Sequence, residues 1–546
     1  MNRFTGLAGG AALFGGVTIL ARLAGFARWG VFSGAVGSTA TGSAYTAANA
    51  LPNVLFEVAA GGALAAIAVP LLAGPLAEGQ VERASRTASC LMTWAVTVLV
   101  PLAGVLALAA TPLAEALLDG AVERARPGST ALAADLIRLF ALQVPLYGIG
   151  VVASGVLQAA KRLFWPAFAP FASSVAVIGV YLAFWWAAGG HQDAPRRLSA
   201  DAVHLLGWGT TAGVAVLTLP LLIPVARLGI RWRPTYRFEA GERRRAASLA
   251  GSGIGALLAQ QAATLAVVAV AGWIGGSGAL PTFNYAQAVY QLPYAVLAVP
   301  LAMSAYPHIA EWAAAGRRDA LIGGVAGTTR VVFAVSAGGA ALLVAAAPGV
   351  QVLFNAIDHS GNAAGLGGAV TWFAPGLLGY GLMAHLQRVL FAVCLDRVAA
   401  RASAAGWLVA AGCGTVFALA GPGGAAPTVA GLAGGISAGM LVAGAGLLRG
   451  IWKALGPGAL AGFARSATVA LVAALIAGGL GRLVTEAVLD LVISALAGAA
   501  PSGVAGALTG AGAAAAGLAV VAGVAASAVW LADRSLLGAL PGPSGP

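Results

Sequence analysis

Long apolar runs recur along the whole chain. Each is roughly 18–25 residues long, which is the length that one α-helix needs to cross a lipid bilayer. The runs do not alternate between polar and apolar residues, so they do not fit the strands of a membrane barrel. Only 9% of the residues are charged, whereas a soluble domain carries roughly 25%. The sequence therefore predicts an all-α polytopic membrane protein.

Dividing the chain into spans gives about fourteen membrane-spanning helices. Glycine is so frequent, at 78 residues, that matches to the G-x-x-x-G packing pattern are expected by chance, and none of them is assigned a role here. We expect helices near 7–32, 43–73, 89–112, 134–158, 165–188, 204–226, 247–275, 280–306, 329–349, 364–391, 401–420, 426–448, 463–480 and 503–532.

The basic residues orient these helices. With a cytoplasmic N-terminus, 21 of the 30 Lys and Arg residues fall on the inside. Only five fall in outside loops, namely Arg124, Arg126, Arg196, Arg197 and Arg482. This bias follows the positive-inside rule, so both termini are expected in the cytoplasm. The net charge of +12 then reflects topology, and nucleic acid is not an expected partner.

The chain is expected to consist of two pseudo-symmetric lobes of six helices each. The N-terminal lobe covers 1–226, a basic cytoplasmic linker follows at 227–246, and the C-terminal lobe covers 247–448. Residues 449–546 add two helices and a short cytoplasmic tail. The charge of the linker suits a segment that rests on anionic lipid.

A faint internal repeat supports two lobes. The recurring pairs include Tyr147-Gly148 with Tyr380-Gly381, at an offset of 233, and Leu51-Pro52 with Leu292-Pro293, at an offset of 241. In a chain this rich in Ala, Gly and Leu, chance matches remain an alternative. Repeated helical halves around a central site are typical of transporters.

Two arginines in the first expected helix are candidates for substrate binding, because a charge within a membrane helix is costly. Arg22 lies roughly 22 Å along the helix, past the bilayer centre, and Arg28 about 9 Å further on. A bend at Gly25 would allow both to reach one cavity. The planar guanidinium group suits phosphate oxygens. The alternative for both residues is snorkelling to the outer interface. Arg138 and Arg388, near helix ends, are interpreted as interface anchors.

Polar residues gather in two further places. Asn49, Asn53 and Glu57 lie on the second expected helix, before Gly61-Gly62. Glu57 could couple transport to an ion or could partner one of the arginines, and we favour the second interpretation. A second polar group in the seventh and eighth helices suggests a hydrated cavity, although each member could simply bridge helices; it contains Gln260, Gln261, Asn284, Tyr285, Tyr290 and Gln291.

Motifs of catalysis are missing from the sequence. It contains no Walker motif, no H-E-x-x-H, no metal-ligand cluster and no nucleophile elbow. Its three cysteines suggest no disulfide framework. A transporter is therefore favoured over an enzyme, and neither a cofactor nor a metal is expected.

Several stretches resemble the MurJ (MviN) family of lipid II flippases. ARLAGFAR (21–28) resembles the family's R-x-x-G-F-x-R signature, and AYTAANALPNVLFEVAAGGALAAIAVPLL (44–72) resembles its second helix in the actinobacterial branch. QAAKRLFWPAFAP (158–170) and YAQAVYQLPYAVLAVPLAMSAYPHIA (285–310) are similar to the loop after helix four and to helix eight. The order of these stretches matches, and the resemblance spans most of the chain.

The resemblance implies two six-helix lobes around a central cavity plus two extra helices. It implies that the chain flips a lipid-linked disaccharide-pentapeptide across the bacterial cell membrane for peptidoglycan synthesis, with Arg22 and Arg28 at the diphosphate. Three positions depart from the family pattern: Ser43 replaces an aspartate, and Glu57 and Ala288 replace arginines. Helix seven also lacks the carboxylate of sodium-binding members. These departures weaken the case for a four-arginine site and for sodium coupling.

A lipid II flippase that works by alternating access is the function we expect. Flipping of another polyprenyl-linked glycan and drug or ion antiport within the same superfamily remain alternatives. The expected partners are the lipid-linked precursor, membrane lipids and cell-wall synthesis or division proteins.

Overall fold

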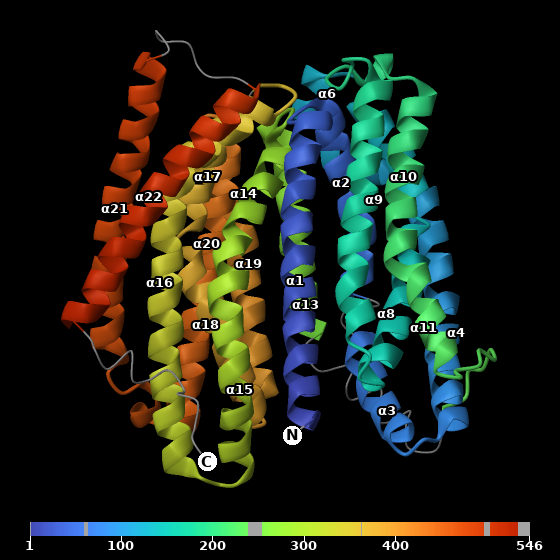
Figure 1. Cartoon of the computed structure of the whole chain (residues 1–546). Helices are drawn as coiled ribbons and strands as arrows, with labels where there is room; N and C mark the ends of the chain where they lie inside the picture. Colours follow the sequence, from blue (N-terminus) through green and yellow to red (C-terminus); the bar gives the residue numbers. More distant parts are fainter. Residues whose placement is uncertain (1, 59–63, 239–253, 362, 496–502, 533–546) are drawn as a thin grey trace. The chain divides into compact units, whose positions relative to one another are not determined.

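The computed structural model describes residues 2–58, 64–238, 254–361, 363–495 and 503–532, and helices and loops without strands make up this part of the chain (Figure 1). The chain divides into two compact units, Met1–Leu257 (unit 1) and Leu258–Pro546 (unit 2). Each unit is described by itself.

Unit 1 is built from long helices joined by short turns. They are α1 (Asn2–Ala35), α2 (Ala40–Phe56), α3 (Ala65–Ala77), α4 (Val81–Leu108), α5 (Ala110–Leu118), α6 (Ala121–Ala125), α7 (Ser129–Phe140), α8 (Gln143–Ala159), α9 (Phe164–Ala188), η2 (Pro195–Arg197), α10 (Ala200–Thr218), η3 (Leu219–Leu221) and α11 (Leu222–Arg227). α1 packs on α9, α9 on α10, and α10 on α8, while α2 lies against α7 and α8.

Unit 2 contains longer helices and two π-helical turns. Its elements are α13 (Ile254–Val270), η4 (Ala271–Gly275), α14 (Ala279–Pro293), η5 (Tyr294–Ala298), α15 (Val299–Ala314), α16 (Arg318–Ile357), α17 (Leu366–Phe373), α18 (Gly376–Ala392), α19 (Asp396–Ala420), α20 (Ala425–Leu455), η6 (Pro457–Leu460), α21 (Phe463–Ala495) and α22 (Gly503–Ala532). α20 packs on α17, α18 and α19, and α21 and α22 pack together on α16.

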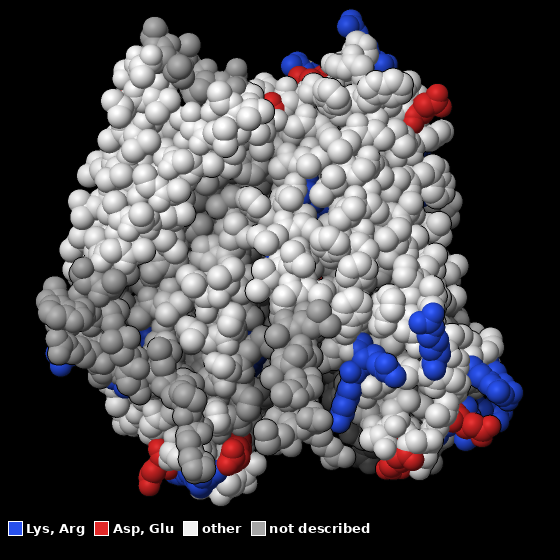
Figure 2. Space-filling view, in the orientation of Figure 1, with Lys and Arg blue, Asp and Glu red and all other residues white. Residues whose placement is uncertain are grey.

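The described residues contain eleven helices that are long and apolar enough to cross a membrane. They correspond to eleven of the expected spans, so the all-α membrane fold is confirmed, whereas the count of about fourteen is not. Of the other three, 7–32 falls on α1, 43–73 on the shorter α2 and α3, and 364–391 on the shorter α17 and α18. Gly61-Gly62 lies outside the described residues. On the face of unit 1 drawn in Figure 2, charged side chains gather at the two ends, with a largely uncharged band between them.

Two carboxylates cap the N-termini of α2 and α7, at the same end of unit 1 as α6 and η2. Asp193 accepts a hydrogen bond of 2.9 Å from the first backbone N–H of α2, and Arg126 approaches the same carboxylate to 2.6 Å. Glu123 accepts bonds of 2.8 Å from the N–H groups of Gly128 and Thr130, at the start of α7. Negative charge is favourable at a helix N-terminus, so both contacts stabilise this end.

The same contacts set the ionisation of Glu123. Partial burial by itself raises the pKa of this carboxyl. The two backbone hydrogen bonds, a side-chain bond from Thr130 and the nearby Arg196 guanidinium outweigh burial and lower the pKa below its ordinary value. Glu123 is therefore ionised at neutral pH.

α19 and α20 pack backbone against backbone. A methyl group on Gly435 of α20 would lie 2.2 Å from Cα of Gly414 on α19, and one on Gly439 would lie 2.4 Å from the carbonyl oxygen of Gly406. Small residues four apart let membrane helices approach this closely. The sequence contains many such spacings by chance, and the structure shows that this one forms a real interface.

The described part of the expected linker is ordered against unit 1. Residues 228–238 follow α11 and lie beside α4, whereas residues 239–246 fall outside the described residues. Figure 1 shows this segment as an extended trace near one end of α4.

Candidate anion-binding site in unit 1

Arg28 has a polar surrounding within the helices of unit 1. It lies seven residues before the C-terminal end of α1 and is half-buried. Its guanidinium group interacts electrostatically with the hydroxyl groups of Tyr45 on α2 and Tyr147 on α8. Arg28 makes no ion pair with any carboxylate among the described residues. A half-buried cation with phenol groups beside it and no acidic partner is suited to an anionic ligand.

Tyr147 connects Arg28 to the polar residues of α2. Its hydroxyl donates a hydrogen bond of 3.1 Å to Oδ1 of Asn53, and its ring packs on Phe56 at 4.6 Å between centroids. Nδ2 of Asn53 in turn donates to the backbone oxygen of Asn49 at 2.8 Å. Tyr147 also interacts electrostatically with Glu57. Among the expected site residues, Arg28, Asn53 and Glu57 thus share one neighbour, Tyr147, which the sequence did not single out as a site residue, whereas Asn49 contributes only its backbone oxygen within α2.

Tyr45 holds one wall of the site in place. It is almost fully buried, and its hydroxyl lies 2.9 Å from that of Tyr181 and 3.2 Å from Oγ1 of Thr210. Its ring packs edge-on against Phe140. These contacts join α2 to α7, α9 and α10, so the hydroxyl beside Arg28 has little freedom to move. A pre-positioned group of this kind orients a ligand at low entropic cost.

Glu57 does not pair with an arginine in this structure. It is half-buried at the π-helical end of α2, and no ion pair joins it to Arg22 or Arg28 among the described residues. The expected direct pairing is therefore wrong. Glu57 and Arg28 each interact electrostatically with Tyr147 instead.

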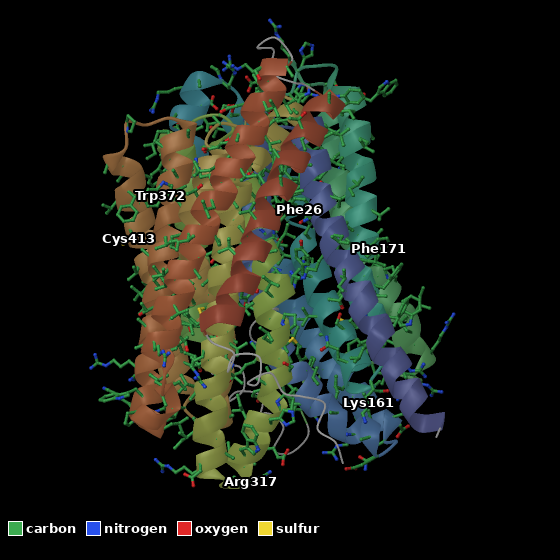
Figure 3. The ribbon with its side chains drawn as sticks, turned by 60° about the vertical axis from the view of Figure 1, so that its left-hand side comes forward. Phe26, Lys161, Phe171, Arg317, Trp372 and Cys413 are labelled. Atoms are coloured by element: carbon green, nitrogen blue, oxygen red, sulfur yellow. The ribbon has the colours of Figure 1, made fainter. Side chains whose placement is uncertain are left out.

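Arg22 differs from Arg28 in its surroundings. It is exposed, and α1 continues through Gly25, where a bend was considered possible, as one uninterrupted helix (Figure 1). Figure 3 shows Phe26 on α1, between the two arginines in the sequence, and Phe171 on α9, the helix against which α1 packs. The structure therefore supports a polar site at Arg28 and leaves Arg22 outside it.

The second expected polar group lies in unit 2. Gln260 and Gln261 are on α13, half-buried and buried respectively, and Gln291 is exposed on α14. Tyr285 has no exposed surface and stacks on Phe354 at 5.1 Å. The expected role of Tyr285 in lining a hydrated cavity is therefore wrong, because it belongs to the core of unit 2.

Tyr290 is also a core residue. It stacks on Phe373 at 4.8 Å and on Tyr380 at 5.9 Å, and it is 3% exposed. Its buried hydroxyl has no hydrogen-bond partner among the residues that the structure describes. Aromatic rings surround this side chain, so the structure gives no support to its expected place in a hydrated cavity.

The two units contain corresponding contacts at the repeated residues. In unit 1, Tyr147 bonds to Asn53, the residue that follows Leu51-Pro52. In unit 2, Tyr380 stacks at 3.9 Å on Tyr294, the residue that follows Leu292-Pro293. A π-helical stretch begins directly after Pro293 and five residues after Pro52. The two contacts differ in kind, so the internal repeat stays a prediction.

Comparison with known proteins decides the family. A family model described as "Lipid II flippase MurJ" matches residues 32–497. The chain belongs to the MurJ family of lipid II flippases. The solved structure "Lipid II flippase MurJ, inward closed conformation" is similar at a TM-score of 0.70 and 15% identity, over 96% of this chain and 100% of that one.

Transporters of a wider superfamily share the fold of this MurJ-family chain. An inward-facing multidrug resistance MATE transporter of the MOP superfamily matches at a TM-score of 0.59 and 15% identity, covering 81% of this chain and 98% of its own. An outward-facing one matches at 0.53 and 16%, covering 81% and 93%. At these identities the structural likeness shows the fold, and the family match carries the function of lipid II flipping.

Proposed function

We propose that the chain moves lipid II from the inner to the outer leaflet of the bacterial cell membrane by alternating access, and that Arg28 binds the diphosphate of the lipid. The family match over residues 32–497 is the observation that carries the transport function. The matched region begins just after the two arginines of α1, so their roles rest on the surroundings described above and on the resemblance of residues 21–28 to the family signature.

The chemistry of Arg28 fits a diphosphate. A diphosphate carries about two negative charges, and each charge-assisted hydrogen bond contributes roughly 1.5–3 kcal/mol. The Tyr147 hydroxyl, which interacts electrostatically with Arg28, donates to Asn53 in this structure and could turn to donate to a phosphate oxygen instead. We place the stronger contact on Arg28. Arg22, exposed one and a half turns earlier on α1, contributes charge to the approaching headgroup.

Glu57 moderates this attraction. A half-buried carboxylate near the same tyrosine lowers the positive potential at Arg28, which favours release of the cargo after transport. Glu57→Gln should then preserve flipping and tighten the apparent affinity for the precursor. Complete loss of flipping with normal expression and a shifted pH profile would instead assign ion coupling to Glu57.

Complementation tests the arginines. Cells depleted of their own flippase should not grow when they express Arg28→Ala. Arg28→Lys should support partial growth, because the lysine ammonium group keeps the charge but cannot bind two phosphate oxygens at once as the planar guanidinium does. Arg22→Ala should support only poor growth. Arg124→Ala, which removes an exposed arginine from α6, is the matched control and should grow normally. Flipping itself is measured as precursor that an impermeant hydrolase can cleave from outside. Normal growth of both α1 variants at equal expression would show that these arginines only snorkel.

The membrane orientation is also part of the proposal. The 21-to-5 bias of basic residues supports cytoplasmic termini. It places the start of α4 and the segment after α11 at the inner surface and the carboxylate-capped end with α6 and η2 at the outer surface.

A further inference from the structure

Residues 231–238, which we name the α4 strap, read Arg-Trp-Arg-Pro-Thr-Tyr-Arg-Phe. Cationic or polar residues alternate with aromatic residues or proline at every position. Alternation with a period of two places the two kinds of side chain on opposite faces of an extended chain. The strap follows α11 and contains no helix or turn.

A row of hydroxyl groups on α4 holds the strap. Oγ of Ser85 accepts a hydrogen bond of 3.2 Å from the Arg231 N–H. Oγ of Ser89 accepts one of 3.0 Å from the Arg233 N–H and donates to the Arg231 oxygen. The next hydroxyl, Thr93, accepts from the Thr235 N–H at 3.1 Å. Alternate residues of the strap are thus bonded to every fourth residue of the helix.

The two periods match because of elementary geometry. Four residues of an α-helix rise about 6.0 Å, and two residues of an extended chain rise about 6.6 Å. A helix that presents hydroxyls four residues apart therefore binds an extended chain in one register. This register fixes which side chains point away from the protein.

The strap lies at a membrane interface. α4 rises roughly 42 Å over its 28 residues, which is about the thickness of a bilayer with its headgroups, and Glu82, Arg83 and Arg86 at its start mark an end at the headgroup level. Aromatic residues mark the boundary itself. The ring of Tyr236 packs edge-on against Trp94 at 5.4 Å, and both rings are about half exposed. Tyr and Trp are typical of the headgroup level.

Three cations of the strap are free to reach headgroups. Arg231, Arg233 and Arg237 are exposed, and no ion pair engages them among the described residues. Figure 2 shows basic side chains gathered at this end of unit 1. An aromatic face toward the acyl chains and an arginine face toward phosphate form the arrangement of an interfacial amphipathic segment.

We propose that the α4 strap is a binding surface for anionic phospholipid, in which Arg231, Arg233 and Arg237 bind headgroup phosphates of the inner leaflet. The hydroxyl row fixes the arginines in register before the lipid arrives, so little ordering entropy is lost on binding. Each arginine near an anionic lipid surface strengthens binding about fivefold, and three together about a hundredfold.

The test uses the full-length protein in detergent. Dioctanoyl phosphatidylglycerol and dioctanoyl phosphatidylcholine are titrated separately, and bound lipid is counted by native mass spectrometry. The wild type should bind phosphatidylglycerol far more tightly than phosphatidylcholine. The triple variant R231Q/R233Q/R237Q should lose about a hundredfold in affinity for phosphatidylglycerol and none for phosphatidylcholine.

Two controls separate the surface from total charge and from the flippase site. R124Q/R196Q/R197Q removes three arginines from the opposite end of unit 1 and should bind phosphatidylglycerol within about twofold of the wild type. Ser89→Ala keeps every charge but removes two bonds of the hydroxyl row, so affinity should fall about fivefold, by the loss of one arginine's contribution.

Several results would overturn the proposal. One is equal affinity of the wild type for the two lipids. Another is an affinity of the triple variant for phosphatidylglycerol within twofold of the wild-type affinity. If Ser89→Ala bound phosphatidylglycerol with unchanged affinity, the argument that the hydroxyl row positions the arginines in advance would be refuted. If the triple variant lost binding of a short-chain polyprenyl diphosphate but kept that of phosphatidylglycerol, the strap would belong to the substrate path instead. None of these outcomes depends on Arg28.

Discussion

Substitution of Gly435 by alanine tests the backbone contact between α19 and α20. Its new methyl group would lie 2.2 Å from Cα and N of Gly414. Ordinary contact begins near 3.4 Å, so the two helices must separate by about 1 Å. Backbone atoms cannot rotate away as a flexible side chain can. Forcing an extra carbon into a packed interface costs roughly 1–3 kcal/mol.

Gly412 supplies the control on α19. It is exposed, and a methyl group there would meet nothing within 4 Å. Alanine in a helix interior is favoured over glycine by roughly 0.5–1 kcal/mol, so Gly412→Ala should be neutral or slightly stabilising. Both variants gain this preference, so Gly435→Ala should be less stable than its control by the packing cost alone, roughly 1–3 kcal/mol.

Thermal unfolding of the purified protein measures the difference. One kcal/mol shifts the midpoint by roughly 2–4 °C for a unit of this size, so Gly435→Ala should unfold roughly 2–12 °C below Gly412→Ala. Both variants are heated at one scan rate, because unfolding of large proteins is often irreversible. Equal midpoints for the two variants would refute the argument that backbone contact limits this interface.

Three further predictions concern unit 1 and its orientation. Tyr147→Phe removes the hydrogen bond to Asn53 and should weaken the apparent affinity for the precursor a few-fold, since such a bond contributes roughly 0.5–1.5 kcal/mol; an unchanged concentration dependence of flipping would contradict this. Because the fold lowers the pKa of Glu123, its ionised form stabilises unit 1 above the ordinary value of 4.5, and this contribution is lost as the pH falls through the lowered value. The wild type should thus unfold at a higher temperature than Glu123→Gln at pH 7, and the two midpoints should converge as the pH falls through the lowered pKa of Glu123; a constant gap would argue against it. A cysteine at position 240, in an otherwise cysteine-free chain, should react with an impermeant reagent only after the cells are permeabilised, whereas labelling of intact cells would reverse the orientation.

The sequence predicted most of the helices because their length and apolarity are set by the bilayer. It also predicted that Arg28, Asn53 and Glu57 would belong to one polar site, since charged and amide groups within spans need polar surroundings. It could not identify Tyr147 as their link. Tyr147 lies on α8, far from Asn53 in the sequence, and only the packing of α8 on α2 shows that the two side chains form a hydrogen bond.

The failures have equally specific causes. Tyr285 carries both a large ring and a hydroxyl, and the sequence gives no sign of which one decides its place; here stacking on Phe354 does. The pairing of Glu57 depended on distances that spacing along a chain does not provide. The contact of Gly414 with Gly435 was hidden among many equivalent spacings. The strap was obscured because Pro234 and the arginines made its alternating pattern resemble an ordinary basic loop.

The glycine contact between α19 and α20 also limits how unit 2 can change shape. Helices separated by side chains slide past one another in small shear steps, but a shift of one residue, about 1.5 Å, would bring Cβ atoms against the backbone where glycines now meet. The pair is therefore locked against shear and turns as one block. Bending is left to places such as η5, where Pro293 removes a backbone donor and the helix is already widened. The two π-helical turns of unit 2, η4 and η5, are places where such bending can occur.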